Sequence, residues 1–375
     1  MKRILITAAV VLLSVSALAQ TQTIYKFKAI KDNKATEVKN QASTGTCWCF
    51  ATTSFLESEL IRQGKGEFDL SEMFTVRNNY NERIFNNYIR AGKGNINPGS
   101  VCHMATDAIA KYGIMPESAY HGINYDSPTH NHGELSMYLK AIAAVSIELK
   151  KQSPQYKAIQ ENLFDTYLGK VPETFEYNGK TYTARTFADM LGFGDMSEYV
   201  ELTSFSHHPF YQKVAVEVPD NWDNGTMYNL PIDEFAEVID SALRNGFTIA
   251  WDGDLTKTFK HNNGIAIEPA NVADYDEALK FEKKFPELVV TQENRQKDFE
   301  EFRTVDDHVM HLTGIYKDQD GNIFYKTKNS WGTGRNEEMG GYLYMSKSYT
   351  LMRCISIMVH KDAIPAAIRA KLGIK

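Results

Sequence analysis

The pattern of apolar and polar positions predicts helices in the first half of the chain and strands in the second. Apolar residues recur at helical spacing in several polar-flanked segments. This spacing predicts helices over residues 47 to about 63, 71–91 and 101–111. It also predicts a long helical stretch over 135–167, broken near Ser153-Pro154, and a shorter helix within 181–199.

Two stretches have the pattern of β-hairpins. Residues 174–182 carry the pair Asn178-Gly179, which is typical of a tight turn between two strands. Farther on, Asp318–Asn322 separates two apolar runs. This segment lacks the glutamate that closes a calcium loop, so we expect a hairpin turn there. The Lys- and Glu-rich residues 274–307 are expected to form a solvated helical segment that leads into a strand.

The helix expected at residue 47 begins with a cysteine in the setting of a nucleophile. Thr44 or Thr46 can cap it, and Gly64 can end it. The partial positive charge at a helix amino terminus favours the thiolate of Cys47. Gln41 can offer a side-chain N–H beside the backbone N–H of Cys47, and two such donors form an oxyanion hole. The alternative is a buried structural cysteine.

The amino-terminal residues have the pattern of a secretory signal. Met1-Lys2-Arg3 is basic, Ile4 to Val15 is almost entirely apolar, and Ala17-Leu18-Ala19 fits a cleavage site. The apolar run is shorter than the ~20 residues of a membrane-spanning helix. We therefore expect residues 1–19 to be removed, with cleavage near Ala19 and Gln20. The mature chain is expected to be periplasmic or secreted, as in bacteria, and not anchored in a membrane.

The composition is that of a globular protein with one large or two modest domains. Of its 375 residues, 43% are hydrophobic and 23% are charged, which is enough to build a full core. The formal net charge is -6 and no basic stripe indicates a nucleic-acid partner. We expect all four cysteines to be free thiols. Cys47 must stay reduced to react, and Cys49 is too close to pair with it and is expected in the core.

Three separated motifs resemble those of the papain-like cysteine peptidases. They are Gln41 followed by Gly45 and Cys47-Trp48, the segment Asp307–Gly314 with its histidine, and Asn329-Ser330-Trp331-Gly332. Their occurrence in this order is far more specific than any one motif. The resemblance implies an α+β fold of two lobes, one helical and one an antiparallel β-barrel. It also implies catalysis without a metal or an organic cofactor.

The same resemblance implies a role for each residue of the site. Cys47 attacks the carbonyl carbon of a peptide, and His308 exchanges the proton. Asn329 fixes the tautomer of the histidine, and Trp331 shields that hydrogen bond from water. Gln41 and the Cys47 N–H bind the oxyanion.

Further features narrow the resemblance to bleomycin hydrolase and aminopeptidase C. Cys47 and His308 are 308 − 47 = 261 residues apart, about twice the ~130–150 of the papain pattern. Residues 20–40 leave no room for a helical pro-segment, and Thr44 stands where a disulfide cysteine is common. The chain is expected to consist of a signal peptide (1–19) and a peptidase domain (20–375). Within the peptidase domain we expect a helical lobe at about 40–120, a largely helical insertion at about 121–215, a β-barrel lobe at about 216–363 and a C-terminal arm at 364–375.

This branch of the family implies an aminopeptidase that is often a homohexamer and takes peptide substrates. Gly99 and Ser100 stand where a Gly-Gly pair lines the substrate cleft, although Pro98-Gly99 also fits a plain turn. The arm that ends at Lys375 would place its terminal carboxylate near the free amino group of the substrate. Its basic residues differ from the usual ending, and a docked amphipathic helix is the alternative. An endopeptidase or a dipeptide-releasing peptidase is the other reading of the activity.

Other candidate sites and functions are weaker. His207-His208 has no accompanying cysteine or carboxylate cluster, so we do not expect a metal site there. His311 has the opposite strand parity to His308 and is expected to be structural.

A catalytically silent binding protein would be indicated by the loss of Cys47, Gln41 or His308, all of which are present. Acyl transfer by the same residues is disfavoured by the peptidase-like Gln41 and Asn329–Gly332.

Overall fold

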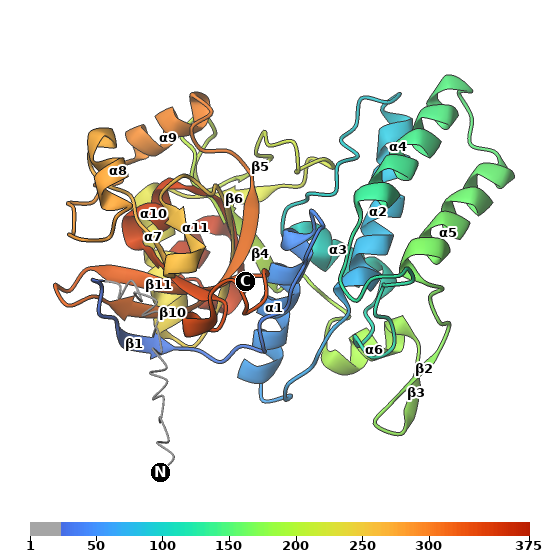
Figure 1. The fold of residues 1–375 in the computed structure, drawn as a ribbon, viewed down its shortest axis with the longest axis horizontal. Helices are drawn as coiled ribbons and strands as arrows, with labels where there is room; N and C mark the ends of the chain where they lie inside the picture. The colour runs from blue at the N-terminus through green and yellow to red at the C-terminus, as the bar shows by residue number, and fades with distance from the viewer. Residues whose placement is uncertain (1–23) are drawn as a thin grey trace, which may run out of the picture.

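The computed structural model describes residues 24–375 and consists of two lobes with α1 (Cys47–Arg62) between them (Figure 1). One lobe is mainly helical, and the other is built on a large sheet. Helix α1 packs against α2 and α3 on one side and against β7 and β10 on the other. The α+β, two-lobe architecture expected from the sequence is confirmed. The expected signal peptide lies outside the described residues.

The helical lobe follows the predicted order of elements closely. The Ser71 hydroxyl accepts a hydrogen bond from Phe74 N and so begins the second helix, and Ser153 caps the helix that starts at Pro154 in the same way. The elements are α2 (Glu72–Ile89), α3 (His103–Tyr112), α4 (Gly133–Glu148), α5 (Pro154–Leu168), the hairpin of β2 (Phe175–Tyr177) and β3 (Lys180–Tyr182), and α6 (Ala184–Leu191).

The sheet lobe contains an eleven-stranded mixed sheet in the described part of the chain. Most neighbouring strands are antiparallel, whereas β4–β6 and β9–β12 are parallel. The strands are β1 (Lys28–Asp32), β4 (Tyr199–Thr203), β5 (Lys213–Val214), β6 (Met227–Asn229), β7 (Ile249–Gly253), β8 (Phe259–Lys260), β9 (Ile265–Ala266), β10 (His308–Lys317), β11 (Ile323–Lys328), β12 (Tyr342–Ser346) and β13 (Cys354–His360). Helices of this lobe are α7 (Ile232–Arg244), α8 (Tyr275–Ala278), α9 (Gln292–Glu300), α10 (Lys347–Met352) and α11 (Ala366–Leu372).

Strand β10 positions the reactive end of the sheet beside α1. It pairs with β7 in a register that places His308 opposite Gly253 and Val309 opposite Asp252. It also pairs with β11, so the residue that follows β11, Asn329, lies near the start of β10. The hairpin expected around Asp318–Asn322 is confirmed, with its turn held by the Asp318 carboxylate.

Several local expectations are corrected. Thr46 is the residue before α1, but neither it nor Thr44 caps the helix through its side chain; the two hydroxyls bond to each other at 2.6 Å. The segment 274–307 is not one solvated helix, because it holds two short helices and buries Arg295. The strands Tyr199–Thr203 and Lys213–Val214, which lie within the stretch expected to be a largely helical insertion, belong to the sheet.

Two main hydrophobic clusters stabilise the lobes. One fills the helical lobe and extends to sheet residues that face it, including Ala250, Val309 and Met358. The other fills the space between the sheet and α7, and the C-terminal helix α11 adds Ile368 and Leu372 to it.

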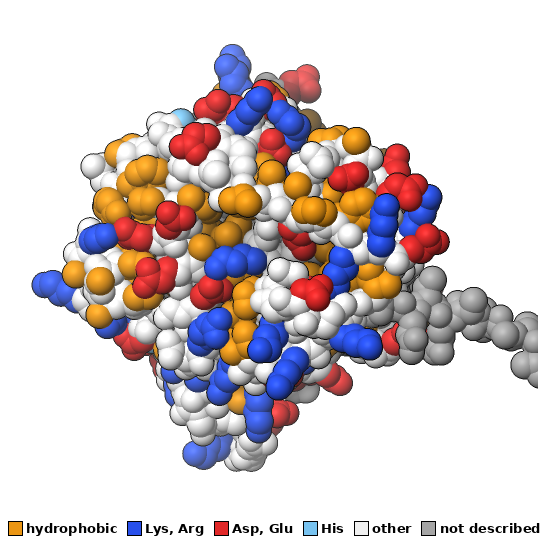
Figure 2. All heavy atoms as spheres, turned by 90° about the vertical axis from the view of Figure 1, so that its left-hand side faces the viewer, with side chains coloured by type: hydrophobic (Ala, Val, Ile, Leu, Met, Phe, Trp, Pro, Cys, Tyr) orange, Lys and Arg blue, Asp and Glu red, His pale blue; other side chains and the backbone are white. Residues whose placement is uncertain are grey.

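Within residues 24–375, no helix is long and apolar enough to cross a membrane. On the sheet-lobe face in Figure 2, basic and acidic side chains are mixed, in keeping with the absence of a basic stripe in the sequence.

Candidate active site

Cys47 is the first residue of α1 and is almost buried where the two lobes meet. Its exposed fraction is 9%, and Trp48 beside it is fully buried. The backbone N–H of a first helical residue has no acceptor within its own helix. The expected placement of Cys47 at a helix amino terminus is confirmed. Its N–H is therefore free to bind an oxygen that approaches the sulfur.

His308 is held by Asn329, as the resemblance implied. Nε2 of His308 lies 2.8 Å from Oδ1 of Asn329, and both residues are buried. This bond fixes the proton on Nε2 and leaves Nδ1 for exchange with the thiol. The ring of Trp331 lies 5.0 Å from the His308 ring and covers the same bond. The backbone of Trp331 is anchored in turn by a bridge to Asn40.

His261 supports Asn329 and was not identified from the sequence. Asn329 Nδ2 lies 3.4 Å from His261 Nδ1, and the His261 ring also contacts Trp331. Burial, with Arg335 and His308 nearby, lowers the pKa of His261 to about 4. A neutral His261 can accept from the amide and keep its oxygen turned toward His308. No motif marks His261 in the sequence, because it acts through a contact between residues far apart in the chain.

Gln41 is oriented as an oxyanion donor. Its Oε1 accepts from Ser330 Oγ at 2.6 Å, and its Nε2 donates to Thr44 O at 2.8 Å. An amide nitrogen carries two hydrogens, so one N–H of Gln41 remains available. Its backbone N–H also donates to Ser330 O, which joins the Gln41 loop to the Asn-Ser-Trp-Gly segment.

The ionisation of Cys47 departs from the thiolate expected for a helix amino terminus. Burial raises the pKa of Cys47 to about 12, the carboxyls of Asp252 and Asp306 add to this effect, and the backbone N–H groups of Val309 and Trp48 oppose it. Burial also lowers the pKa of His308, although Asn329 partly offsets the effect. The raised pKa of Cys47 and the lowered pKa of His308 both favour a neutral thiol and a neutral imidazole.

A loop of the sheet lobe covers the predicted substrate-binding residues Gly99 and Ser100. This loop, residues 215–226 between β5 and β6, is called the cleft loop below (Figure 1). Its Trp222 donates from Nε1 to Ser100 Oγ at 3.1 Å. Its Asp220 accepts from Asn95 at 3.0 Å. Ser100 is 2% exposed, so its role in substrate binding stays a prediction.

The C-terminal residues form a helix and not the extended arm considered from the sequence. The alternative of a docked amphipathic helix is confirmed, because Ile368 and Leu372 of α11 are buried against the sheet lobe. Ion pairs of Arg369 with Asp362 and of Lys371 with Glu234 fix its outer side. Lys375 lies beside a hollow between α3, β4 and α11 whose lining does not include Cys47 or His308. Its predicted contact with substrate stays untested.

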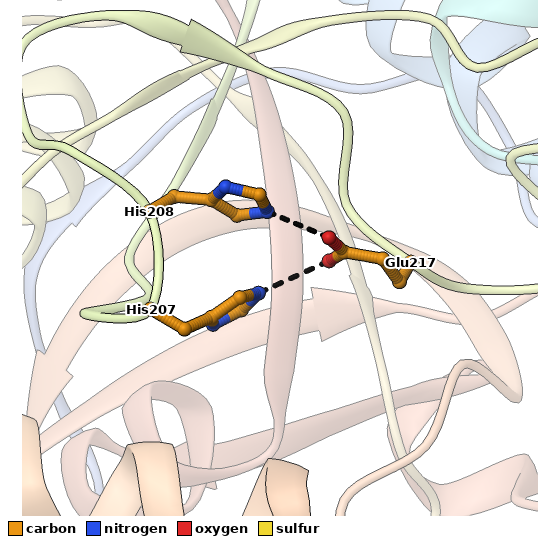
Figure 3. Close-up of side chains that lie close together, drawn as sticks. All are labelled: His207, His208 and Glu217. Atoms are coloured by element: carbon orange, nitrogen blue, oxygen red, sulfur yellow. Dashed lines mark hydrogen bonds and ion pairs between the residues drawn. The ribbon is translucent and has the colours of Figure 1, made fainter.

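His207 and His208 do have a carboxylate neighbour, which the sequence analysis did not identify. Both rings point at Glu217, with Nε2–Oε distances of 3.0 and 2.9 Å (Figure 3). The amide of Gln296 accepts from Ser206 N through its oxygen and so turns its NH2 toward His207 Nδ1. His207 Nδ1 must therefore accept, and its proton sits on Nε2, facing Glu217. A protonated Nε2 does not offer a lone pair to a metal ion.

His103 closes a second cluster in which a metal ion would compete with existing bonds. Its Nδ1 meets Glu201, and its Nε2 lies 3.2 Å from Asp223 Oδ1. Burial alone would lower the pKa of His103, but the two carboxylates outweigh it and hold the pKa well above its ordinary value. The charged ring thus ties the cleft loop, through Asp223, to β4 and α3.

Comparison with known proteins identifies a matching family model and several similar chains. A family model described as Peptidase C1-like family matches residues 6–374. Aminopeptidase C of Streptococcus thermophilus is 25% identical over 378 residues, which cover 88% of this chain and 81% of that protein. Bleomycin hydrolase of Rattus norvegicus is 22% identical over 396 residues, which cover 92% and 85%. The crystal structure of PepW from Lactobacillus rhamnosis superposes on this chain with a TM-score of 0.70 and is 22% identical in sequence. The superposition covers 92% of this chain and 84% of PepW and shows that the two share a fold.

Proposed function

The chain belongs to the Peptidase C1-like family and is a cysteine peptidase, and from this premise we propose that it is an aminopeptidase that removes residues from the free amino end of peptides. Relatives named aminopeptidase C, aminopeptidase W and aminopeptidase G support this activity. The resemblance to bleomycin hydrolase and aminopeptidase C, drawn from the motifs, is confirmed.

We propose the following chemistry for Cys47, His308, Asn329 and Gln41. His308 takes the proton of Cys47 as the sulfur attacks the carbonyl carbon, and the developing oxyanion is bound by the free N–H of Gln41 and the N–H of Cys47. His308 then gives the proton to the leaving amine, and an acyl-enzyme remains. Water, activated by the same imidazole, hydrolyses the thioester and restores the thiol.

The cleft loop is the observation that carries the choice of an aminopeptidase. An endopeptidase needs a cleft that lets the substrate continue on both sides of the cysteine. Here Trp222 and Asp220 of the cleft loop are bonded across Ser100 and Asn95 of the helical lobe. We infer that this bridge shortens the cleft and leaves room for only a short amino-terminal piece. An endopeptidase or a dipeptide-releasing enzyme is the second candidate, and a catalytically silent binding protein is a distant third because all four catalytic residues are present.

The test is to follow cleavage of one peptide of about ten residues by mass spectrometry, with its amino terminus either free or acetylated. An aminopeptidase yields a ladder of products shortened by one residue from the free end and leaves the acetylated peptide intact. Internal fragments from both peptides identify an endopeptidase. Release of residue pairs from the free peptide identifies the dipeptide-releasing alternative. Cys47→Ala controls for contaminating peptidases.

We also propose that the protein is exported. The support is the basic, apolar and small-residue pattern of residues 1–19, which end before the first described residue. Expression of the full chain in a bacterial host, followed by fractionation and amino-terminal sequencing, is the check. A periplasmic protein that starts at Gln20 is the expected result, and a cytoplasmic protein that retains Met1 would contradict it.

Self-association is the last element of the proposal. The resemblance to bleomycin hydrolases suggests a homohexamer. Exposed apolar side chains also concentrate on α2, on α4 and the residue after it, and on α5: Phe85, Ile89, Met137, Tyr138, Val145, Leu149 and Ile159. Such a concentration is typical of a surface that meets another protein. Light scattering coupled to size-exclusion chromatography measures the mass directly, and a monomer at working concentration would contradict this element alone.

A further inference from the structure

An unusual carboxyl lies next to the reactive residues. Asp252 is 0% exposed, and no N–H or hydroxyl group of the described residues donates to its side-chain oxygens, although the carboxyl of Asp306 lies within hydrogen-bonding reach of it. On β7 it shares a face with Ala250, which packs toward the helical lobe, and it lies opposite Val309, the neighbour of His308. Its carboxyl is therefore aimed at the junction of the lobes that also contains Cys47.

Two further carboxyls approach the same junction from different elements. Asp306 lies two residues before His308, and its Oδ2 is buried without a partner in the described structure. Asp220 belongs to the cleft loop and lies directly against Gly99, so closely that a Cβ at position 99 would collide with its carboxylate. Asp252, Asp306 and Asp220 thus approach the region between Cys47 and the cleft loop from the sheet lobe.

The surrounding cations do not balance these charges. Two other acids act on this cluster: Glu201 is already paired with His103, and Asp307 adds a negative charge beside Asp306. Arg83 is the cation that faces Asp220 and Asp306, and its guanidinium donates to Gly99 O and Ser100 Oγ. One arginine cannot neutralise three carboxylates. Burial and Asp220 accordingly raise the pKa of Asp306 to about 7, while burial and Asp306 hold the pKa of Asp252 well above its ordinary value.

We propose that Asp252, Asp306 and Asp220 form a cation subsite that binds an ammonium group of the substrate beside Cys47. The inference rests on the proposed aminopeptidase function and deepens it, because it names the residues that recognise the amine. An entering ammonium group takes the place of the proton that Asp252 and Asp306 can share and donates to their carboxylates. The C-terminal helix is bonded to the outside of the sheet lobe. We therefore assign recognition of the amine to side chains of this lobe and not to the C-terminal carboxylate.

Such a group can come from two parts of a peptide, the terminal amine or a lysine side chain. Three coumarin amides separate these sources: alanyl with a free amine, acetyl-alanyl, and acetyl-lysyl, so that removal of a single residue releases the fluorophore. Each is tested on the wild type, Asp252→Asn, Asp306→Asn and Asp220→Asn. Asp276→Asn, an exposed residue whose side chain pairs with Lys257, is the matched control.

The expected result is a fall of at least about tenfold in kcat/KM for the free-amine substrate in the three variants, as for the loss of a charge-assisted contact. The acetyl-alanyl amide is expected to be unaffected, since asparagine resembles the protonated acid. If the lysyl substrate alone is affected, the subsite binds a side chain. Wild-type preference for the free amine that survives in all variants overturns the subsite but not the aminopeptidase. Wild-type preference for the acetyl-alanyl amide overturns the aminopeptidase itself. Asp220→Asn changes only a loop and keeps the test valid if a core variant fails to fold.

Discussion

His308 Nε2 and Asn329 Oδ1 lie 2.8 Å apart, although 329 − 308 = 21 residues separate them in the chain. The hairpin of β10 and β11 brings them together, since one residue begins the first strand and the other follows the second. This bond sets which nitrogen of His308 faces the thiol.

Asn329→Ala is expected to lower kcat by about 10- to 100-fold, because the imidazole loses the partner that fixes its tautomer, and a positioned acid–base group contributes ~10²–10⁴ in all. KM should change little. Steady-state kinetics on a free-amine substrate measures both values. Asn329→Asp restores an acceptor and should recover part of kcat, and a change confined to KM would show that Asn329 acts on substrate binding instead.

Gln41→Ala is expected to reduce kcat by about 10²- to 10³-fold, the usual cost of one oxyanion donor. The thiol of Cys47 should still react with iodoacetamide at the wild-type rate, since alkylation forms no oxyanion. The two rates measured on the same preparation separate these effects. Equal losses in both would mean that the variant disturbs the position of Cys47.

Trp222→Ala is expected to speed alkylation of Cys47 severalfold at neutral pH. The substitution removes the bond from the cleft loop to Ser100, exposes Cys47 and weakens the burial that raises its pKa to about 12. In the wild type, the alkylation rate should keep rising to at least about pH 10, because ever more thiolate forms. Equal rates in the two proteins would show that the cleft loop does not shield the sulfur.

Asp306→Asn is expected to become more stable relative to the wild type as pH rises. Burial raises the pKa of Asp306 to about 7, whereas the unfolded chain ionises this group near pH 4. The folded protein therefore binds the extra proton between these values, and the free energy of unfolding of the wild type falls as pH rises through the window. Denaturant titrations at about pH 5 and pH 8 give the difference. Asp276→Asn should show none.

Removal of residues 373–375 is expected to leave the preference for a free amine intact, since these residues lie beside a hollow that does not contain Cys47 or His308. The ratio of kcat/KM for free and acetylated substrates, before and after truncation, is the measurement. Loss of the preference would place the C-terminal carboxylate in the cleft after all.

The local patterns of the sequence predicted much of the fold. The helix expected from residue 71, the break at Ser153-Pro154 and the Asn178-Gly179 turn all depend on neighbours in the chain, and all are found. Cys47, His308, Asn329 and Gln41 were identified because each stands in a motif of its own.

The remaining features depend on contacts between distant residues. His261 reaches Asn329 from another part of the sheet, and Asp252 matters only because β7 lies beside β10. The cleft loop has no motif that reveals its contact with Ser100. The thiolate expected at Cys47 is not favoured, for a related reason. The helix terminus lowers the pKa of the thiol through local contacts, whereas the burial that raises it comes from residues of both lobes.

The most direct test of the account is the ratio of kcat/KM for alanyl coumarin amide with a free and with an acetylated amine, measured under reducing conditions. The account predicts a ratio well above one that vanishes, with all activity, in Cys47→Ala. A ratio below one, or activity that survives in Cys47→Ala, would contradict it.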